Sequence, residues 1–226
     1  MGYYTSMVIL IPAIIFAMYA QVRVKSTFSK YLRVRNSRGI TGAQAARRIL
    51  DQNDLYDVPI ELSKGSLSDH YDPRKRVLRL SPEVHNGTSV ASVSVAAHES
   101  GHALQHAHSY APLTIRNSIA PTVGFASQAA MPLVLLGLFM GRSGGLLMDI
   151  GIYLYAFAVF FQVITLPVEF NASSRAIVQL EANGLINNEE KPRAKRVLNA
   201  AALTYVAAMA VAIANLLRLI ILRNRD

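Results

Sequence analysis

The segment His98-Glu99-Ser100-Gly101-His102 combines two imidazoles and a carboxylate at a spacing that suits metal-dependent hydrolysis. On a helix, residues four apart lie on one face, so His98 and His102 can both bind one zinc ion. Glu99 is turned by about 100° from His98 around the helix, which puts its carboxylate beside the metal rather than on it. A carboxylate in that position can act as a general base toward water. We therefore predict a catalytic zinc site here, in preference to a structural pair of histidines.

A catalytic zinc site needs a third protein ligand, and the histidines that follow on the same segment fit poorly. His108 stands where the pattern HExxHxxGxxH has its third histidine, but Gln105 replaces the glycine that breaks the helix in that pattern. On an unbroken helix His108 lies about 15 Å along the axis from His98, and His106 lies about 12 Å from it. We expect neither His106 nor His108 to bind the ion.

A carboxylate from a later segment is the other source of a third ligand. Asp149 lies at the far end of an apolar run, about 30 Å from its other end, and Glu181 lies about 18 Å beyond Glu169. The other acidic residues after the motif lie in polar ends: Glu189, Glu190 and Asp226. Glu169 stands where the apolar run ends, and a carboxylate there is costly without a partner such as a cation. We predict Glu169 as the third ligand; the alternative is a glutamate at the lipid interface.

Four stretches without charged residues lie around the motif, at 1–22, 117–141, 150–168 and 197–217. About 20 apolar residues are needed to cross a bilayer as a helix. The chain has 52% hydrophobic and 16% charged residues, whereas about 25% charged residues is usual in soluble domains. We predict about four transmembrane helices rather than a large soluble bundle, because too little amphipathic surface remains to cover four such helices.

The placement of the 23 Lys and Arg residues predicts the orientation in the membrane. Fourteen lie in 23–116 and five in 175–196, whereas Arg142 is the one between the second and third apolar stretches. Positive residues mark the cytoplasmic side, so we expect 23–118 and 169–196 in the cytoplasm and both termini outside. The basic tail 223–225 leaves a cytoplasmic C-terminus as the alternative.

The charge and the missing cysteines narrow the partners and ligands. A net charge of +9 placed next to apolar stretches favours contact with anionic lipid over nucleic acid, which we do not expect as a partner. Because the chain has no cysteine, a metal must be held by histidines and carboxylates. The stretch 1–22 lacks a basic region before it, so we interpret it as a retained anchor rather than a signal peptide.

The polar part before the motif predicts a small α/β core with an antiparallel sheet. An amphipathic helix over 40–50 has Thr41 as its N-cap, and a buried helix over 88–108 carries the motif. We predict strands at 58–63, 67–72 and 77–80. The whole is an α+β membrane protein with a transmembrane helix at 1–22, a cytoplasmic metalloprotease core at 23–116, transmembrane helices at 117–168, a cytoplasmic helix with the third zinc ligand at 169–196, and a fourth transmembrane helix at 197–222.

Three blocks of the sequence, HESGHALQHAHSYAPL, LSDHYDPRKRVLRLS and TLPVEFNASSRA, resemble the YugP-like neutral zinc metallopeptidases, a family of bacterial membrane proteins. The resemblance extends over nearly the whole chain, including ALTYVAA near its end. It implies a gluzincin-type core in the plasma membrane, with Zn²⁺ bound by His98, His102 and Glu169 and with Glu99 as the base. The family usually has an acidic residue two positions after the third ligand. This chain has Asn171 there, whose amide oxygen can still accept a hydrogen bond from a zinc histidine.

The expected reaction is the hydrolysis of peptide bonds in membrane-associated or membrane-proximal proteins. We expect the substrate to lie extended along residues 77–81 as an edge strand. His70, Tyr71 and Arg175 are candidates for stabilising the oxyanion, and each has a structural role as its alternative. The identity of the substrate stays open, as do a membrane adaptor and a homo-oligomer.

Two other classes of function compete with the protease. A catalytically silent zinc-binding membrane scaffold has no need for a base such as Glu99 beside an open coordination position. A zinc transporter needs His or carboxylate ligands in the middle of the bilayer, and the interiors of the four apolar stretches offer none.

Overall fold

The computed structural model describes residues 7–224, which divide into two compact units. The helical unit contains the residues up to Gln21, Thr114–Pro167, and the chain from Thr204 onward. The mixed unit contains Val22–Leu113 and Val168–Leu203. The long helices α2 (Leu10–Leu32), α7 (Gly145–Ala182) and α8 (Glu190–Arg223) contribute residues to both units.

Three helices among the described residues are long and apolar enough to cross a membrane: Ala111–Phe139, Gly141–Ala182 and Glu190–Arg223. The prediction of a fourth at 1–22 was wrong for the part of this stretch that the structure describes. Helix α2 begins at Leu10 and continues through Arg23 and Lys25, so its uncharged part is about 20 Å long, less than a bilayer core requires. Residues 1–6 of the predicted span lie outside the described residues.

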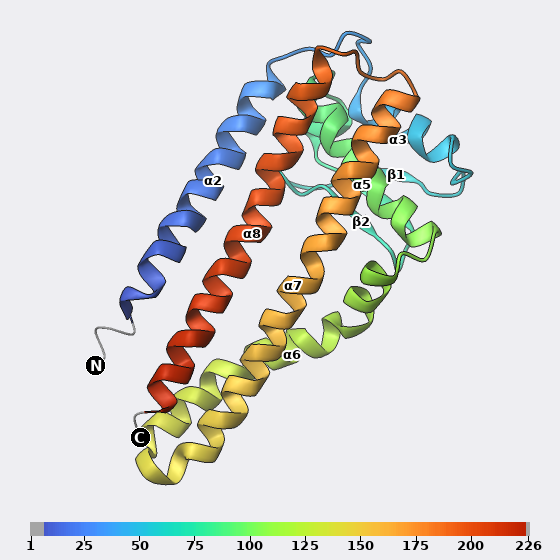
Figure 1. Ribbon diagram of the computed structural model, residues 1–226. Coiled ribbons are helices and arrows are strands. Elements are labelled where there is room, and N and C mark those ends of the chain that lie inside the picture. Colours follow the sequence, from blue (N-terminus) through green and yellow to red (C-terminus); the bar gives the residue numbers. More distant parts are fainter. Residues whose placement is uncertain (1–6, 225–226) are drawn as a thin grey trace. The chain divides into compact units, whose positions relative to one another are not determined.

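In the helical unit, helix α6 (Ala111–Phe139) and the first half of α7 form a tight hairpin, visible in Figure 1. The 3-10 turn Gly141–Gly144 connects them, and such a short connection makes the two helices antiparallel neighbours. A Cβ added to Gly144 would lie 2.1 Å from the carbonyl oxygen of Gly137, and one on Gly151 would lie 2.8 Å from that of Ala130. Small residues let apolar helices approach to backbone contact, which is how helix pairs associate without a hydrophobic driving force.

The start of α7 and the end of α8 lie at the same end of the helical unit, because an ion pair joins them. Arg223 donates from Nε to Asp149 Oδ1 at 2.6 Å and from Nη2 to Oδ2 at 2.9 Å, a two-pronged arrangement that fixes the orientation of both groups. Leu219 on α8 packs against Met148 on α7 beside it. Arg223 at the start of the basic tail is thus neutralised by a carboxylate next to the α6–α7 turn.

The mixed unit contains α3 (Gly42–Asp51), β1 (Ile60–Leu62), β2 (His70–Asp72), β3 (Val77–Leu80), α4 (Pro82–His85) and α5 (Val90–Ala107). Thr41 is the N-cap of α3 as predicted, and it exchanges hydrogen bonds with Gln44 in a capping box. The apolar face of α3, which includes Ile49 and Leu50, is buried against the core that α5 shares.

The sheet has the strand order β1-β3-β2 and is mixed rather than antiparallel, which corrects the prediction. Strand β1 pairs with β3 in parallel, and β2 pairs with β3 antiparallel. Since β3 is paired on both sides, it is a central strand, so the prediction that residues 77–81 form an edge strand was also wrong. Val77, Leu78 and Leu80 are buried, which explains why this strand takes the centre of the sheet.

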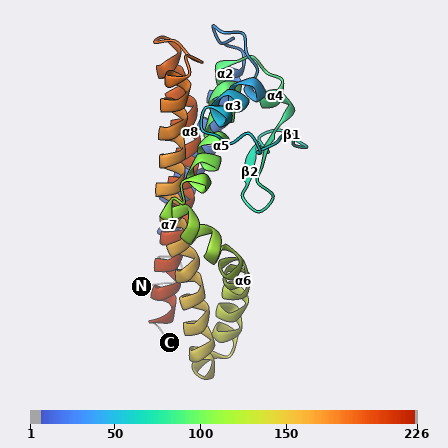
Figure 2. The ribbon, with the colours of Figure 1, turned by 90° about the vertical axis from the view of Figure 1, so that its right-hand side faces the viewer.

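Helix α5 is the central element of the mixed unit. Figure 2 shows it between the C-terminal part of α7 and the sheet. Its buried residues are mostly small, being alanines, serines and one glycine, together with Val90, Val93 and Leu104 and the polar Glu99 and Gln105. Small side chains on several faces allow neighbours to pack closely on more than one side of the helix. The histidine motif therefore lies on a helix held by α3, α7 and the sheet.

The glycine contacts of the hairpin predict that Gly151→Ala destabilises the helical unit. Its new Cβ would lie 2.8 Å from the Ala130 oxygen and 2.9 Å from the Val134 nitrogen, so the backbones must separate. We expect a loss of about 1–3 kcal/mol, seen as a lower unfolding temperature of the purified protein in detergent. Gly124→Ala is the matched control, because a Cβ on Gly124 meets nothing within 4 Å. Equal unfolding temperatures for the two variants would contradict this packing.

Candidate metal centre

The structure brings together the side chains of His98, His102 and Glu169, although 66 residues lie between the second and the third in the sequence. The Nε2 atoms of His98 and His102 lie 3.3 Å and 3.6 Å from Oε2 of Glu169. The two rings meet edge to face, with their centroids 4.8 Å apart. The Glu169 residue is 3% exposed, so its carboxylate is directed into the protein toward the two imidazoles.

This donor set fits a zinc ion. Zinc in proteins is tetrahedral with bonds of about 2.0–2.1 Å to nitrogen and oxygen, which puts neighbouring ligand atoms about 3.4 Å apart. The measured separations of 3.3 Å and 3.6 Å between imidazole nitrogens and carboxylate oxygen agree with that spacing. Two histidines and one carboxylate also leave a coordination position for water or substrate, as catalytic zinc sites do.

The group forms where α5 and α7 approach to backbone contact. A Cβ on Gly101 would lie 2.7 Å from the carbonyl oxygen of Ala172, so a larger residue there would push the helices apart. Gly101 lies between His98 and His102 on α5, and Ala172 lies one turn after Glu169 on α7. The crossing point therefore sets the carboxylate opposite both imidazoles, and it explains the glycine within the motif.

Each imidazole has an oxygen partner for its other ring nitrogen. Nδ1 of His98 lies 3.1 Å from Oγ of Ser173, and Nδ1 of His102 lies 3.0 Å from Oε1 of Gln105. Such partners fix the ring orientation and leave Nε2 to bind a metal. Sequence reasoning did not assign a role to Ser173 or Gln105. Their spacing was the available signal, since Gln105 is three residues after His102 and Ser173 is four after Glu169.

Asn171 does not accept a hydrogen bond from a histidine of the group, in contrast to the role that the sequence left open for it. Its Oδ1 accepts from Nε2 of Gln105 at 3.0 Å and from Nε of Arg175 at 2.8 Å. Asn171 is thereby linked to His102 through Gln105.

Glu99 lies beside the group without being one of the three converging residues. The residue is 9% exposed, and its negative charge is felt by both His102 and Asp69. Burial lowers the pKa of His102, but the hydrogen bond to Glu169 and the charges of Glu99 and Glu169 outweigh it and raise this pKa above its ordinary value. Burial raises the pKa of Asp69, and the charge of Glu99 raises it further. The carboxylates of Glu99 and Glu169 both act on His102, and two negative charges so close together at a buried site favour binding of a cation there.

The three predicted oxyanion candidates lie in different surroundings. The hydroxyl of Tyr71 on β2 lies 2.9 Å from Nδ1 of His106, which turns it toward the end of α5. Neighbouring residues of a strand point to opposite faces, and His70 is accordingly exposed, with its Nδ1 2.8 Å from the Ser68 carbonyl oxygen. Arg175 is engaged by Asn171.

His106 and His108 lie outside the converging group, as the helix spacing predicted. Among residues 7–224, one cluster of three or more His, Asp or Glu side chains could hold a metal ion, and it consists of His98, His102 and Glu169. His106 pairs with Tyr71, and His108 is the C-cap of α5 with its Nδ1 2.8 Å from the Leu104 carbonyl oxygen.

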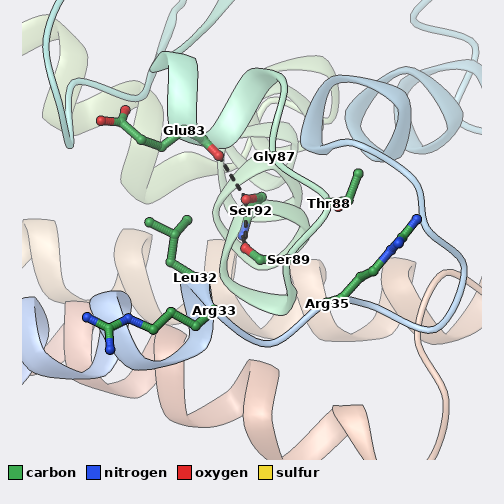
Figure 3. A pocket seen from close by; sticks show the side chains of 8 residues that line it. All are labelled: Leu32, Arg33, Arg35, Glu83, Gly87, Thr88, Ser89 and Ser92. Atoms are coloured by element: carbon green, nitrogen blue, oxygen red, sulfur yellow. Dashed lines mark hydrogen bonds between the residues drawn. The ribbon is translucent and has the colours of Figure 1, made fainter.

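A surface hollow of about 320 Å³ lies at the other end of α5 and does not contain this chemistry. Ser89 caps the helix there, about 13 Å along the axis from His98, and Ser92 donates to the Glu83 carbonyl oxygen. Figure 3 shows that the side chains of Arg33 and Arg35, which also line the hollow, point in opposite directions. They do not form a clamp for an anion.

The geometry predicts that Glu169→Ala abolishes stoichiometric zinc binding, because two imidazoles alone hold the ion weakly. His106→Ala and His108→Ala are the matched controls and should retain zinc, since neither ring belongs to the group. The measurement is the zinc content of each purified protein after dialysis. Zinc retained in Glu169→Ala, or lost in either control, would mean that the ligand set is a different one.

Comparison with known proteins agrees with this centre. Residues 6–224 match the family described as "Putative neutral zinc metallopeptidase". The chain is 53% identical over 218 residues to the Bacillus subtilis protein named "Putative membrane protease YugP", and the aligned part covers 96% of each chain. No solved structure matches it significantly. Because both matches extend over nearly the whole length rather than over the histidine motif alone, the chain belongs to this family of neutral zinc metallopeptidases.

Proposed function

We propose that this protein is a zinc-dependent endopeptidase that hydrolyses peptide bonds of membrane-associated or membrane-proximal proteins, with Glu99 as the general base. The observation that carries this proposal is the buried carboxylate of Glu99 next to the group of His98, His102 and Glu169. Within residues 7–224 it makes no hydrogen bond or ion pair. The Glu99 side-chain oxygens are not among the fully enclosed, unpartnered polar atoms of the described residues, so this carboxylate can meet water or substrate at the group.

The four residues have two different roles, metal binding and proton transfer. His98, His102 and Glu169 would hold zinc, which polarises a peptide carbonyl and lowers the pKa of water when it is bound. Glu99 takes a proton from the attacking water as the water oxygen bonds to the carbonyl carbon. Glu99 then delivers that proton to the amide nitrogen as the C–N bond breaks, so that a carboxylic acid and an amine leave and Glu99 is again ionised.

Strand β2 is the edge that best suits an extended substrate. Its neighbour β3 is paired on both sides, whereas β2 is paired on one side only. Strand β2 packs against α5, and Tyr71 reaches His106 one turn beyond His102. A peptide added to the free edge of β2 would gain main-chain hydrogen bonds and run past the end of α5 that carries the histidines.

Tyr71 is the side chain best suited to donate a hydrogen bond to the developing oxyanion. Burial raises its pKa above the ordinary value, although Arg76 acts against this, so its hydroxyl stays protonated at neutral pH. Its neighbour His70 is exposed, and Arg175 is engaged by Asn171. The Tyr71 side chain is half-buried, and the contact with Nδ1 of His106 holds its hydroxyl in place; when Nδ1 carries the proton, the hydroxyl is free to donate to the oxyanion.

The protein associates with membranes, as the three apolar helices and the name of the relative indicate. We propose that the helices cross the bacterial plasma membrane and that the metal centre faces the cytoplasm, since 19 of 23 Lys and Arg lie in 23–116 and 175–196. The Asp149–Arg223 ion pair supports a C-terminus on the outer side, because it joins the end of α8 to the α6–α7 turn. Anionic lipid is the expected partner of the basic segments.

Glu99→Gln separates a protease from a zinc scaffold. We expect the variant to keep its zinc, since Glu99 is not in the converging group, and to lose cleavage of a membrane-protein substrate by at least about 10³-fold. Glu189→Gln, an exposed change on the same unit, is the control and should leave cleavage unchanged. Wild-type cleavage by Glu99→Gln would eliminate the proposed mechanism.

Tyr71→Phe tests the oxyanion role and should lower kcat by about 10²-fold while zinc content and KM change little. The comparison variant is His70→Gln on the opposite face of β2, for which we expect near-normal kcat. A Tyr71→Phe enzyme with unchanged kcat would remove Tyr71 from the reaction.

A further inference from the structure

Gln105 is a fully buried polar residue near the end of α5, and three of its hydrogen-bonding positions are used. Its Oε1 lies 3.0 Å from Nδ1 of His102, and its Nε2 lies 2.8 Å from the carbonyl oxygen of Val168 and 3.0 Å from Oδ1 of Asn171. A buried amide is costly unless it is hydrogen-bonded, and an apolar side chain would fill the same space without that demand. A polar amide at this buried position between α5 and α7 therefore indicates that its hydrogen bonds have a role in the metal centre.

The partners of Gln105 fix the direction of its amide. The backbone oxygen of Val168 can only accept a hydrogen bond, and Oδ1 of Asn171 faces the Gln105 Nε2 while it also accepts from Nε of Arg175. The NH₂ group must therefore point toward α7, and Oε1 must point toward His102. A flipped amide would set one oxygen against two others.

The fixed amide in turn decides which nitrogen of His102 carries the proton. Because Oε1 of Gln105 is an acceptor, Nδ1 of His102 must carry a proton and donate it, so Nε2 is the nitrogen left to bind a metal ion on the side of Glu169. The partner of His98 differs in this respect. The Ser173 hydroxyl can donate or accept, so it does not by itself select a tautomer.

We propose that Gln105 is a positioning residue of the metal centre, which presets the tautomer of His102 and ties α5 to the turn of α7 just before Glu169. This link between the helices is direct, because Gln105 donates a hydrogen bond to the carbonyl oxygen of Val168, the residue next to Glu169. The inference rests on the proposed zinc site. It predicts that Gln105 contributes to zinc affinity without contacting the ion.

The test compares two variants of similar shape in the purified full-length protein. Gln105→Met removes every hydrogen bond, whereas Gln105→Glu with its second oxygen protonated keeps an acceptor for His102 Nδ1 and a donor for the Val168 carbonyl oxygen. Zinc affinity is measured by competition with a chromophoric chelator, and stability by thermal unfolding of the metal-free protein. We expect zinc to bind about 10–100-fold more weakly to Gln105→Met, and at least about fivefold more tightly to Gln105→Glu than to Gln105→Met. Ser100→Ala is the control and should leave zinc affinity unchanged, because the buried Ser100 hydroxyl donates to the Ala96 carbonyl oxygen of its own helix α5.

The outcomes separate this inference from the proposed function. A Gln105→Met protein that binds zinc within about twofold of the wild type, or a Gln105→Glu protein as weak as Gln105→Met, would overturn the positioning role. In both cases a wild type that binds zinc leaves the proposed function standing. A wild type that binds no zinc would overturn the proposed function and this inference together.

Discussion

The backbone contact between α5 and α7 is the constraint on which the metal centre depends. Gly101 and Ala172 meet where a single added carbon would lie 2.7 Å from a carbonyl oxygen, and the three converging side chains lie within one turn of that contact. Because Nε2 and Oε2 atoms must come to about 3.4 Å for a shared zinc ion, a shift of about 1 Å between the helices would remove the fit. The small side chains of α5 serve that approach, and Gln105 adds a polar bond across it.

Hydrogen bonds around the imidazoles extend this constraint into a connected network. His102 is joined through Gln105 to Asn171 and Arg175, and His98 is joined to Ser173, so the polar partners of both histidines lie on or bond to α7. One helix thus supplies the carboxylate and much of the support for the imidazoles of the other. A neutral amide chain of this kind orients an imidazole without adding a negative charge beside Glu99 and Glu169.

Local patterns predicted the parts of this protein that depend on neighbours in sequence. The four-residue spacing of His98 and His102 and the N-cap at Thr41 are properties of single helices. Glu169 was deduced from its place at the end of an apolar run, and the structure brings it to the two histidines. The partners Gln105 and Ser173 were missed because their roles require knowing how α5 and α7 cross.

The predictions that were wrong concern the pairing of the strands and the length of the first apolar segment. Strand order is not encoded in a short strand, so the buried β3 was taken for an edge when it lies between β1 and β2. One residue of register separates Tyr71, which faces His106, from the exposed His70. The apolar stretch at the start of the chain was counted as a span, but α2 continues into basic residues.

X-ray absorption at the zinc edge of the zinc-loaded full-length protein tests the central claim most directly. Two imidazoles joined by the Glu169 carboxylate predict a first shell of nitrogen and oxygen at about 2.0–2.1 Å, with outer-shell scattering from two imidazole rings. Scattering from three imidazoles, or from none, would contradict a centre built from His98, His102 and Glu169.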